Sequence, residues 1–258
     1  MNKLLLIVRF LWMQVYVRGL NVYEKVFEPH WHITHRMPSP LMRYRVSGTS
    51  DKLFYLDAGR SMWSETLHQI RTHARQSMID SDKGTASTLR ILDYGCGCGR
   101  VARHIVPESI KYMGVDIDDI AVEWCKEHLG HIGHFDNISA MSAIPDGALD
   151  AIMSVSVFTR IDFDVQEELI TEFFRMLKVG GIIVLSIHGT YAAHKNLNPS
   201  DFQTFLKEGR LFKKSKFMSS YFSSAFCGAD MEFLNAFDYI PCGLGGWQDI
   251  VVMKKVKE

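Results

Sequence analysis

Apolar and amphipathic segments alternate through the middle of the chain. Four short apolar runs have the length and the β-branched content of buried strands: residues 89–94, 111–115, 149–155 and 182–187. Two segments between them, residues 119–129 and 165–177, carry apolar side chains at helical spacing. Because strand and helix patterns alternate, we predict an α/β fold with a doubly wound, mainly parallel sheet.

Weaker patterns surround this region. We predict helices over residues 61–81, 101–106 and 199–216. We also predict strands near residues 131–138, 231–239 and 248–255, the last two of which could form a C-terminal hairpin. The Gly180-Gly181 pair should close the helix before it.

The N-terminal 60 residues differ from the rest. Residues 4–17 are strongly apolar but shorter than the roughly 20 residues that a membrane-spanning helix needs. We expect a helix packed on the domain or on a second copy in a homo-oligomer, and an interfacial membrane helix is the alternative. Residues 28–48 contain three prolines and three histidines and should be irregular, with loop histidines that bind no metal. We therefore divide the chain into an N-terminal extension, residues 1–60, which could form a substrate lid or an oligomer contact, and a main domain, residues 61–258.

Composition narrows the classes of function. The formal net charge of zero gives no reason to expect an obligatory nucleic-acid partner. Five cysteines, an odd number, favour a reducing compartment, and we expect a cytoplasmic protein. Cys96 and Cys98 form a C-x-C pair without a second pair at metal spacing, so we expect no metal.

Three glycines follow the first apolar run at alternate positions: Gly95, Gly97 and Gly99. A strand, tight turn and helix in this order form the place where an α/β sheet binds a nucleotide-like ligand. The dinucleotide-binding pattern is G-x-G-x-x-G, but here the third glycine comes one residue early and Arg100 takes the last glycine's place. With Asp93 before it, the motif reads D-x-G-x-G-x-G.

A second acidic residue, Asp116, ends the next apolar run, 23 positions after Asp93. A carboxylate at the tip of the second strand can accept hydrogen bonds from both hydroxyls of a ribose. The alternative is that Asp116 caps the helix that begins near Asp119.

Residues 89–188 resemble the class I S-adenosylmethionine (SAM) dependent methyltransferases. The resemblance rests on the glycine motif, on Asp116, on the I-P-D-G-A-L-D run at residues 144–150, and on R-M-L-K-V-G-G at residues 175–181. Further details are similar to a bacterial subgroup that acts on small molecules or glycans, although Arg160 stands where that subgroup commonly has histidine. The resemblance implies a Rossmann-like seven-stranded sheet and SAM as the cofactor.

The resemblance also implies a cofactor site made of these residues: Asp93, Gly95, Gly97, Gly99, Asp116, Ile117 and Asn137. In this assignment the glycines line the methionine part and Asp116 binds the ribose. Asp93 orients the loop or reaches the amino group through water. Asn137 contacts adenine through its amide and Ile117 through its apolar side chain, although they could equally be a turn residue and a core residue.

Candidate catalytic residues follow the fourth and fifth strands. His188 suits a general base because its ordinary pKa is near 6.5. Ser156 and Arg160 lie in the loop after the fourth strand, and Arg160 could bind an anionic acceptor or pair with a neighbouring aspartate.

These residues predict transfer of a methyl group from SAM to a small-molecule or sugar-containing acceptor, by O- or N-methylation. The loop after the fourth strand lacks the Asn/Asp-Pro-Pro-Tyr/Phe sequence of enzymes that methylate the amino groups of nucleic-acid bases. Residues 20–60 and 190–245 should form the acceptor site, with Trp247 and Tyr191 among the candidate aromatic residues. Two alternatives remain open: an NAD(P)-dependent oxidoreductase and a catalytically silent SAM-fold module that serves as a scaffold.

Overall fold

The computed structural model describes residues 3–27, 36–74, 88–106, 109–213, 219–222 and 237–256, with only the backbone described for residues 3–10, 219–222 and 237. The expected histidines of residues 30–35, the end of the predicted helix near Met78 and the first part of the predicted strand 231–239 lie outside these ranges.

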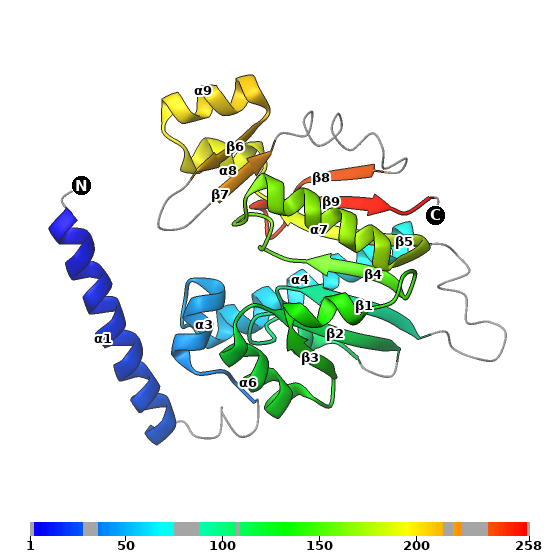
Figure 1. Ribbon diagram of the computed structural model, residues 1–258. Helices are drawn as coiled ribbons and strands as arrows, with labels where there is room; N and C mark the ends of the chain where they lie inside the picture. The colour runs from blue at the N-terminus through cyan, green and yellow to red at the C-terminus, as the bar shows by residue number, and fades with distance from the viewer. Residues whose placement is uncertain are drawn as a thin grey trace.

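A seven-stranded sheet forms the centre of the protein (Figure 1). Its strands are β1 (Leu89–Tyr94), β2 (Ile110–Asp116), β3 (Gly133–Asn137), β4 (Leu149–Ser154), β5 (Leu177–Ile187), β8 (Phe237–Leu244) and β9 (Gln248–Lys254). The order in the sheet is β3-β2-β1-β4-β5-β9-β8, and β1 to β5 pair in parallel. The C-terminal hairpin adds β9 and β8 in antiparallel pairing, as predicted.

Side chains from the sheet pack into two cores, one on each face. Ile91 and its neighbour Leu92 point into different cores, as successive residues of a strand must. The first core includes Ile70 of α4 (Lys52–His73) and Leu129 of α6 (Asp119–Leu129). The second includes Phe173 of α7 (Phe163–Met176). The sheet is therefore the middle layer of three, which confirms the predicted α/β class.

Helices near the sheet begin and end at different residues from those predicted. Helix α4 begins at Lys52, capped by Asp51, so the predicted boundary between residues 60 and 61 falls within it. The helix predicted after the glycine turn is wrong: only a 3-10 turn, η1 (Ala102–His104), forms, and Ile105 is already extended. Pro107 follows closely in the sequence, and a proline disfavours helical conformation in the residue before it.

The Gly180-Gly181 pair does not close α7, contrary to the prediction. The helix ends at Met176 because Leu177 adopts an extended conformation and begins β5. Gly180 lies within β5 with a φ of 88°, near the place where the register against β4 shifts. A positive φ suits glycine, so this pair supports a strand irregularity.

Smaller elements follow β5 and precede α4. Helices α8 (Thr190–Asn196) and α9 (Pro199–Glu208) are followed by a two-stranded sheet of β6 (Arg210–Lys213) and β7 (Ser219–Phe222). Residues 28–48 are not wholly irregular, as we had expected, because α3 (Pro40–Ser47) lies within them. Pro40 stands in its first turn, where a missing N–H costs no hydrogen bond, and Ser39 caps it.

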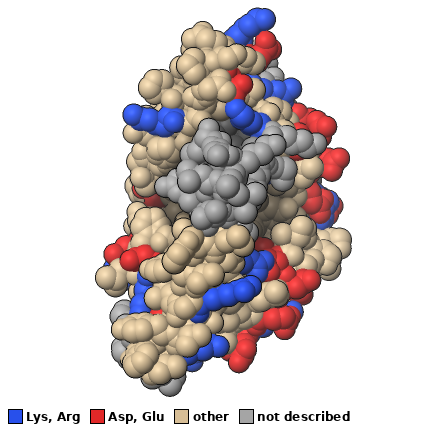
Figure 2. Space-filling view, turned by 90° about the vertical axis from the view of Figure 1, so that its left-hand side faces the viewer, with Lys and Arg blue, Asp and Glu red and all other residues tan. Residues whose placement is uncertain are grey.

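Helix α1 (Lys3–Phe27) lies beside the rest of the protein, facing α3 (Figure 1). The side chains of Leu11, Trp12, Val15 and Tyr16 are exposed. Figure 2 shows this side of the molecule, where uncharged residues are interspersed with positively and negatively charged side chains. Among the described helices, none combines the length and apolar character needed to cross a bilayer.

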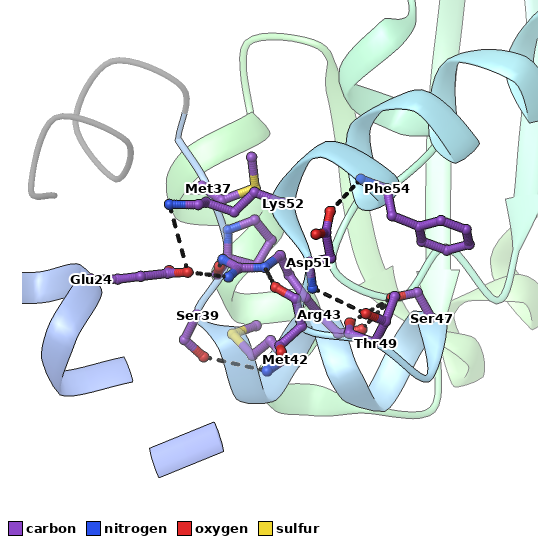
Figure 3. Close-up of polar contacts among 12 residues, drawn as sticks. Glu24, Met37, Ser39, Met42, Arg43, Ser47, Thr49, Asp51, Lys52 and Phe54 are labelled. Carbon is purple, nitrogen blue, oxygen red and sulfur yellow. Dashed lines mark hydrogen bonds and ion pairs between the residues drawn. The ribbon is translucent and has the colours of Figure 1, made fainter. Parts of the chain in front are cut away.

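A buried ion pair attaches α1 to α3 (Figure 3). Glu24 of α1 accepts a hydrogen bond of 2.6 Å from Arg43, and the two side chains are 2% and 0% exposed. Arg43 also donates to the carbonyl groups of Pro38 and Ser50, and Lys52 lies 3.8 Å from the Glu24 carboxylate. Since both charges are removed from water, each depends on its partner.

Replacing Glu24→Gln should therefore lower the free energy of unfolding by about 3 kcal/mol, because the Arg43 guanidinium stays buried without its counter-charge. Denaturant titration followed by circular dichroism measures this change. Glu123→Gln, which removes an exposed ion pair with Lys126, is the matched control and should have little effect. Equal losses in the two variants would contradict this account of α1.

Candidate active site

The glycine turn connects β1 to η1 and is bonded to the end of β2. Gly95, Gly97 and Gly99 all have positive φ, at 84°, 53° and 72°. The amide groups of Gly95 and Cys96 donate to the carbonyl oxygen of Val115, over 2.8 and 3.1 Å. A Cβ on Gly95 would come within 2.1 Å of a methyl group of Val157, so a larger residue would displace the loop after β4.

Asp116 ends β2 directly beside this turn. One carboxylate oxygen accepts a hydrogen bond from the Gly97 amide at 2.7 Å, and the other accepts one from the Asp118 amide at 2.9 Å. The helix cap of α6 is Asp118, so the alternative role of Asp116 as that cap is wrong. Each oxygen of the Asp116 carboxylate retains a free lone pair for a further donor.

Asp93 is buried under the turn. Tyr112 donates a hydrogen bond of 2.7 Å to its carboxylate. Burial raises the pKa of Asp93 to about 7, the Tyr112 bond opposes this, and the nearby Asp116 raises it further. Near neutral pH this carboxylate is therefore close to its titration midpoint.

A cavity of about 380 Å³ lies above the turn. Its lining includes Asp93, Gly95, Gly97, Asp116 and Ile117, five of the seven residues predicted for the cofactor site. The Ile117 side chain is 77% exposed, and an apolar group at such a place offers contact to a flat ligand.

Gly99 and Asn137 are not part of the cavity lining. Gly99 packs instead against α6, where a Cβ would lie 2.2 Å from Leu129. The side chain of Asn137 donates to Asp119 and accepts from the Ser139 amide, so both of its polar groups are engaged. The role of Asn137 toward adenine stays a prediction.

The loop after β4 forms one wall of the cavity. Ser156 has a φ of 62°, a strained conformation for serine, and such strain is concentrated at functional sites. Its amide donates to Ser186 at 2.7 Å and its hydroxyl donates to Gln248 at 3.1 Å, so β5 and β9 hold it in place. Arg160 is exposed and lines the same cavity.

A second cavity of about 550 Å³ adjoins the first. The two cavities share four residues: Val46, Arg100, Ser156 and Arg160. The remaining lining comes from the end of α3, from α4 and from the β8–β9 turn, and it includes the predicted Trp247. Tyr191 stacks edge-on against that tryptophan with ring centroids 5.7 Å apart.

His188 follows β5 and lines neither cavity. Burial, with a smaller contribution from the positive charge of Arg160, lowers the pKa of His188 to about 4. The imidazole is thus neutral at pH 7 but is a weak base. Ser156 and Arg160 line both cavities and His188 lines neither, so the geometry does not support the predicted role of His188 as a general base.

Several lining residues were missed in the sequence. Arg45 and Val46 come from α3, some 50 positions before the glycine turn, and no local pattern marks them. The sequence marks Arg100 only because it replaces a glycine, and Gln248 only as the first residue of a predicted strand. Tertiary packing brings these residues to the site.

Comparison with known proteins supports the methyltransferase class that the sequence resembles. Residues 92–185 match the family model described as "Methyltransferase domain". A curated relative, the tRNA N(3)-methylcytidine methyltransferase trm140 of Schizosaccharomyces pombe, is 26% identical over 124 residues, which are 43% of this chain and 40% of that protein. The chain spans less than half the length of the curated relatives that it matches.

Solved structures share the fold. A SAM-dependent methyltransferase from Clostridium acetobutylicum aligns with a TM-score of 0.54 and 11% identity, over 91% of this chain and 99% of that one. The glycopeptide N-methyltransferase MtfA in complex with sinefungin aligns with a TM-score of 0.50 and 11% identity, over 76% and 93%. Residues 92–185 therefore resemble a methyltransferase domain, and the chain shares the fold of these class I SAM-dependent methyltransferases.

The residues present fit SAM, the cofactor that the resemblance implies. The first cavity offers a carboxylate with free lone pairs toward hydroxyl groups, a buried aspartate toward a cation, and an exposed apolar side chain. The carboxylates of Asp93 and Asp116 suit a ligand that carries both a sulfonium and an ammonium group.

The affinity for SAM should depend on pH through Asp93. A cationic ligand favours the ionised carboxylate, and the raised pKa means that Asp93 becomes protonated as the pH falls. The association constant should drop about tenfold between about pH 8 and about pH 6. Calorimetric titration at several pH values measures this change.

Asp93→Asn is the control for this experiment. The asparagine oxygen still accepts the hydrogen bond of Tyr112, and any titration of SAM itself is the same with both proteins. The difference between the pH profiles of the variant and the parent therefore reports the titration of Asp93. Identical pH profiles for the two proteins would contradict a role for the Asp93 charge in binding.

Proposed function

We propose that this protein transfers the methyl group of SAM to an oxygen or nitrogen atom of a small-molecule or sugar-containing acceptor. The observation that supports this proposal is the second cavity, which joins the cofactor cavity through four shared residues. An acceptor in one cavity and a methyl donor in the other would meet at these residues.

The cofactor roles in this proposal follow the geometry. Asp116 accepts hydrogen bonds from the ribose hydroxyls, and Asp93 faces the ammonium group. The backbone at Gly95 and Gly97 lines the methionine part, where side chains would obstruct it. Ile117 contacts the adenine ring, with Asn137 nearby at the end of β3.

SAM supplies an electrophilic methyl group on a sulfonium ion. The chain's own contribution is to align the acceptor with that methyl group and to keep water out. Ser156 and Arg160 are placed to position the acceptor because they line both cavities and because Ser156 is fixed by two hydrogen bonds.

Titration of the purified protein with SAM, S-adenosylhomocysteine and NAD in parallel tests the cofactor. We expect the first two to bind and NAD not to bind. Binding of NAD alone would support the oxidoreductase alternative. A protein that binds none of the three would support the scaffold alternative.

The relative from Schizosaccharomyces pombe is named for action on tRNA, so RNA is a necessary comparison in the acceptor assay. The neutral net charge and the volume of the second cavity, about 550 Å³, favour a small acceptor. Methyl transfer from labelled SAM to total tRNA, and not to small molecules, would overturn this preference.

Replacing Asp116→Ala should weaken SAM binding by about 10- to 150-fold, because hydrogen bonds from the ribose hydroxyls to a charged acceptor are lost. Calorimetry gives the affinity, and circular dichroism tests whether the fold persists. Glu123→Ala, on the exposed face of α6, is the matched control and should bind SAM as the parent does. Unchanged affinity in Asp116→Ala would exclude the proposed ribose contact.

A further inference from the structure

The four residues shared by the two cavities carry two positive charges and no negative charge. They comprise two arginines, one serine and one valine, without a carboxylate, an imidazole or a thiol. Methyl transfer to a hydroxyl or a protonated amine requires a group that removes a proton. None of the four shared side chains is suited to that task, and His188 lines neither cavity.

Arg100 is a buried cation that lines both cavities. Its side chain is 8% exposed, and its Nε atom has no hydrogen-bond partner among the described residues. Its backbone is held in place because Gly59 of α4 packs directly on its carbonyl group, where a Cβ would clash at 2.1 Å. Burial lowers the pKa of Arg100 and the Asp93 carboxylate opposes this with a smaller effect, but no described carboxylate forms an ion pair with its guanidinium.

Arg160 is the second cation at this place. Of the described carboxylates, none forms an ion pair with it, and the neighbouring Asp162 instead caps α7. Asp57 is the acidic residue in the described lining of the second cavity, and it is exposed and lies 3.8 Å from Arg60. Neither arginine forms an ion pair with a described carboxylate, and although Asp93 offsets part of the charge of Arg100, both can contact a negatively charged ligand.

The rest of the second cavity is mainly apolar. Phe54 and Met62 of α4 face the β8–β9 turn with Leu244 and Trp247. The acids of the site lie in the other cavity, where Asp93 and Asp116 are placed toward the cofactor. The first cavity also contains Arg45, Arg100 and Arg160, so the two shared arginines lie at the junction between these acids and the mainly apolar second cavity.

We propose that the acceptor is a small carboxylic acid with an apolar body, whose carboxylate lies between Arg100 and Arg160 and itself receives the methyl group. This inference rests on the proposed function and specifies its acceptor class. The apolar body packs against Phe54, Met62 and Trp247.

The reaction then needs no base. A carboxylate oxygen is already ionised at neutral pH and forms the new bond to the methyl carbon. The carbon–sulfur bond breaks and its electron pair goes to sulfur, which leaves a neutral thioether. The products are a methyl ester and S-adenosylhomocysteine, with no proton gained or lost.

The first test measures binding in the presence of saturating S-adenosylhomocysteine. Phenylacetate, cinnamate, indole-3-acetate and octanoate are each titrated beside the matching primary amide, which has the same shape without the charge. We expect at least one acid to bind about tenfold or more tightly than its amide, because arginine–carboxylate hydrogen bonds are charge-assisted. Failure of every acid to exceed its amide would overturn the proposal.

Substitution assigns the preference to the two arginines. Arg160→Gln, at an exposed position, should abolish the preference for acid over amide and leave the affinity for S-adenosylhomocysteine unchanged. Arg100→Gln should do the same where it folds. Arg71→Gln, an exposed residue of α4 outside both cavities, is the matched control and should retain the preference. Loss of S-adenosylhomocysteine affinity in Arg160→Gln, with the acid preference intact, would show that this arginine serves the cofactor and would overturn the proposal.

The product identifies the accepting atom. With methyl-labelled SAM, an acid that binds should yield a labelled product that releases methanol in alkali, as a methyl ester does. An alkali-stable methylated product, or no product from any acid that binds, would exclude transfer to the carboxylate. Loss of S-adenosylhomocysteine binding by the parent protein would instead refute the proposed function, so the two failures are distinguishable.

Discussion

The hydrogen bond from the Gly97 amide to the Asp116 carboxylate joins the two segments on which the site depends. The turn after β1 and the tip of β2 come together because these strands are parallel neighbours, with Asp93 paired to Gly114 and Tyr94 to Val115. Parallel strands place their carboxyl ends at one edge of the sheet, where ligands bind in open α/β folds. The cavity, its acidic lining and the titration of Asp93 all follow from this pairing.

The walls of the site come from segments far apart in the chain. Val46 of α3 lies against the glycine turn, and Tyr55 of α4 donates a hydrogen bond of 2.9 Å to the Cys98 carbonyl group. The N-terminal extension thus takes part in the site directly. Within this extension, the ion pair between Glu24 and Arg43 connects α1 to α3, so the position of α1 depends on a buried ion pair as well as on apolar packing.

The prediction of the sheet succeeded where the pattern was strong. Four apolar strands and the glycine turn were found from periodicity and local composition, because buried parallel strands are nearly continuous in apolar residues. Helix ends were less accurate. The segment after Gly99 contains helix-forming residues, yet it forms only a 3-10 turn. Gly180 lies within a strand and does not end a helix. In both places neighbouring packing outweighs a weak local preference.

The sequence alone determined the class of fold, the glycine turn and the two acids that line the first cavity, because each is encoded by residues close together in the chain. Only the tertiary structure decided which positively charged side chains line the same cavity as these acids. Arg100 and Arg160 are 60 positions apart, and nothing local shows that both line one cavity or that neither pairs with a described carboxylate. The same holds for His188, whose pKa is set by burial that no sequence pattern reports. Short motifs specify which chemical groups lie close together in the chain, whereas burial and charge pairing depend on contacts between distant segments.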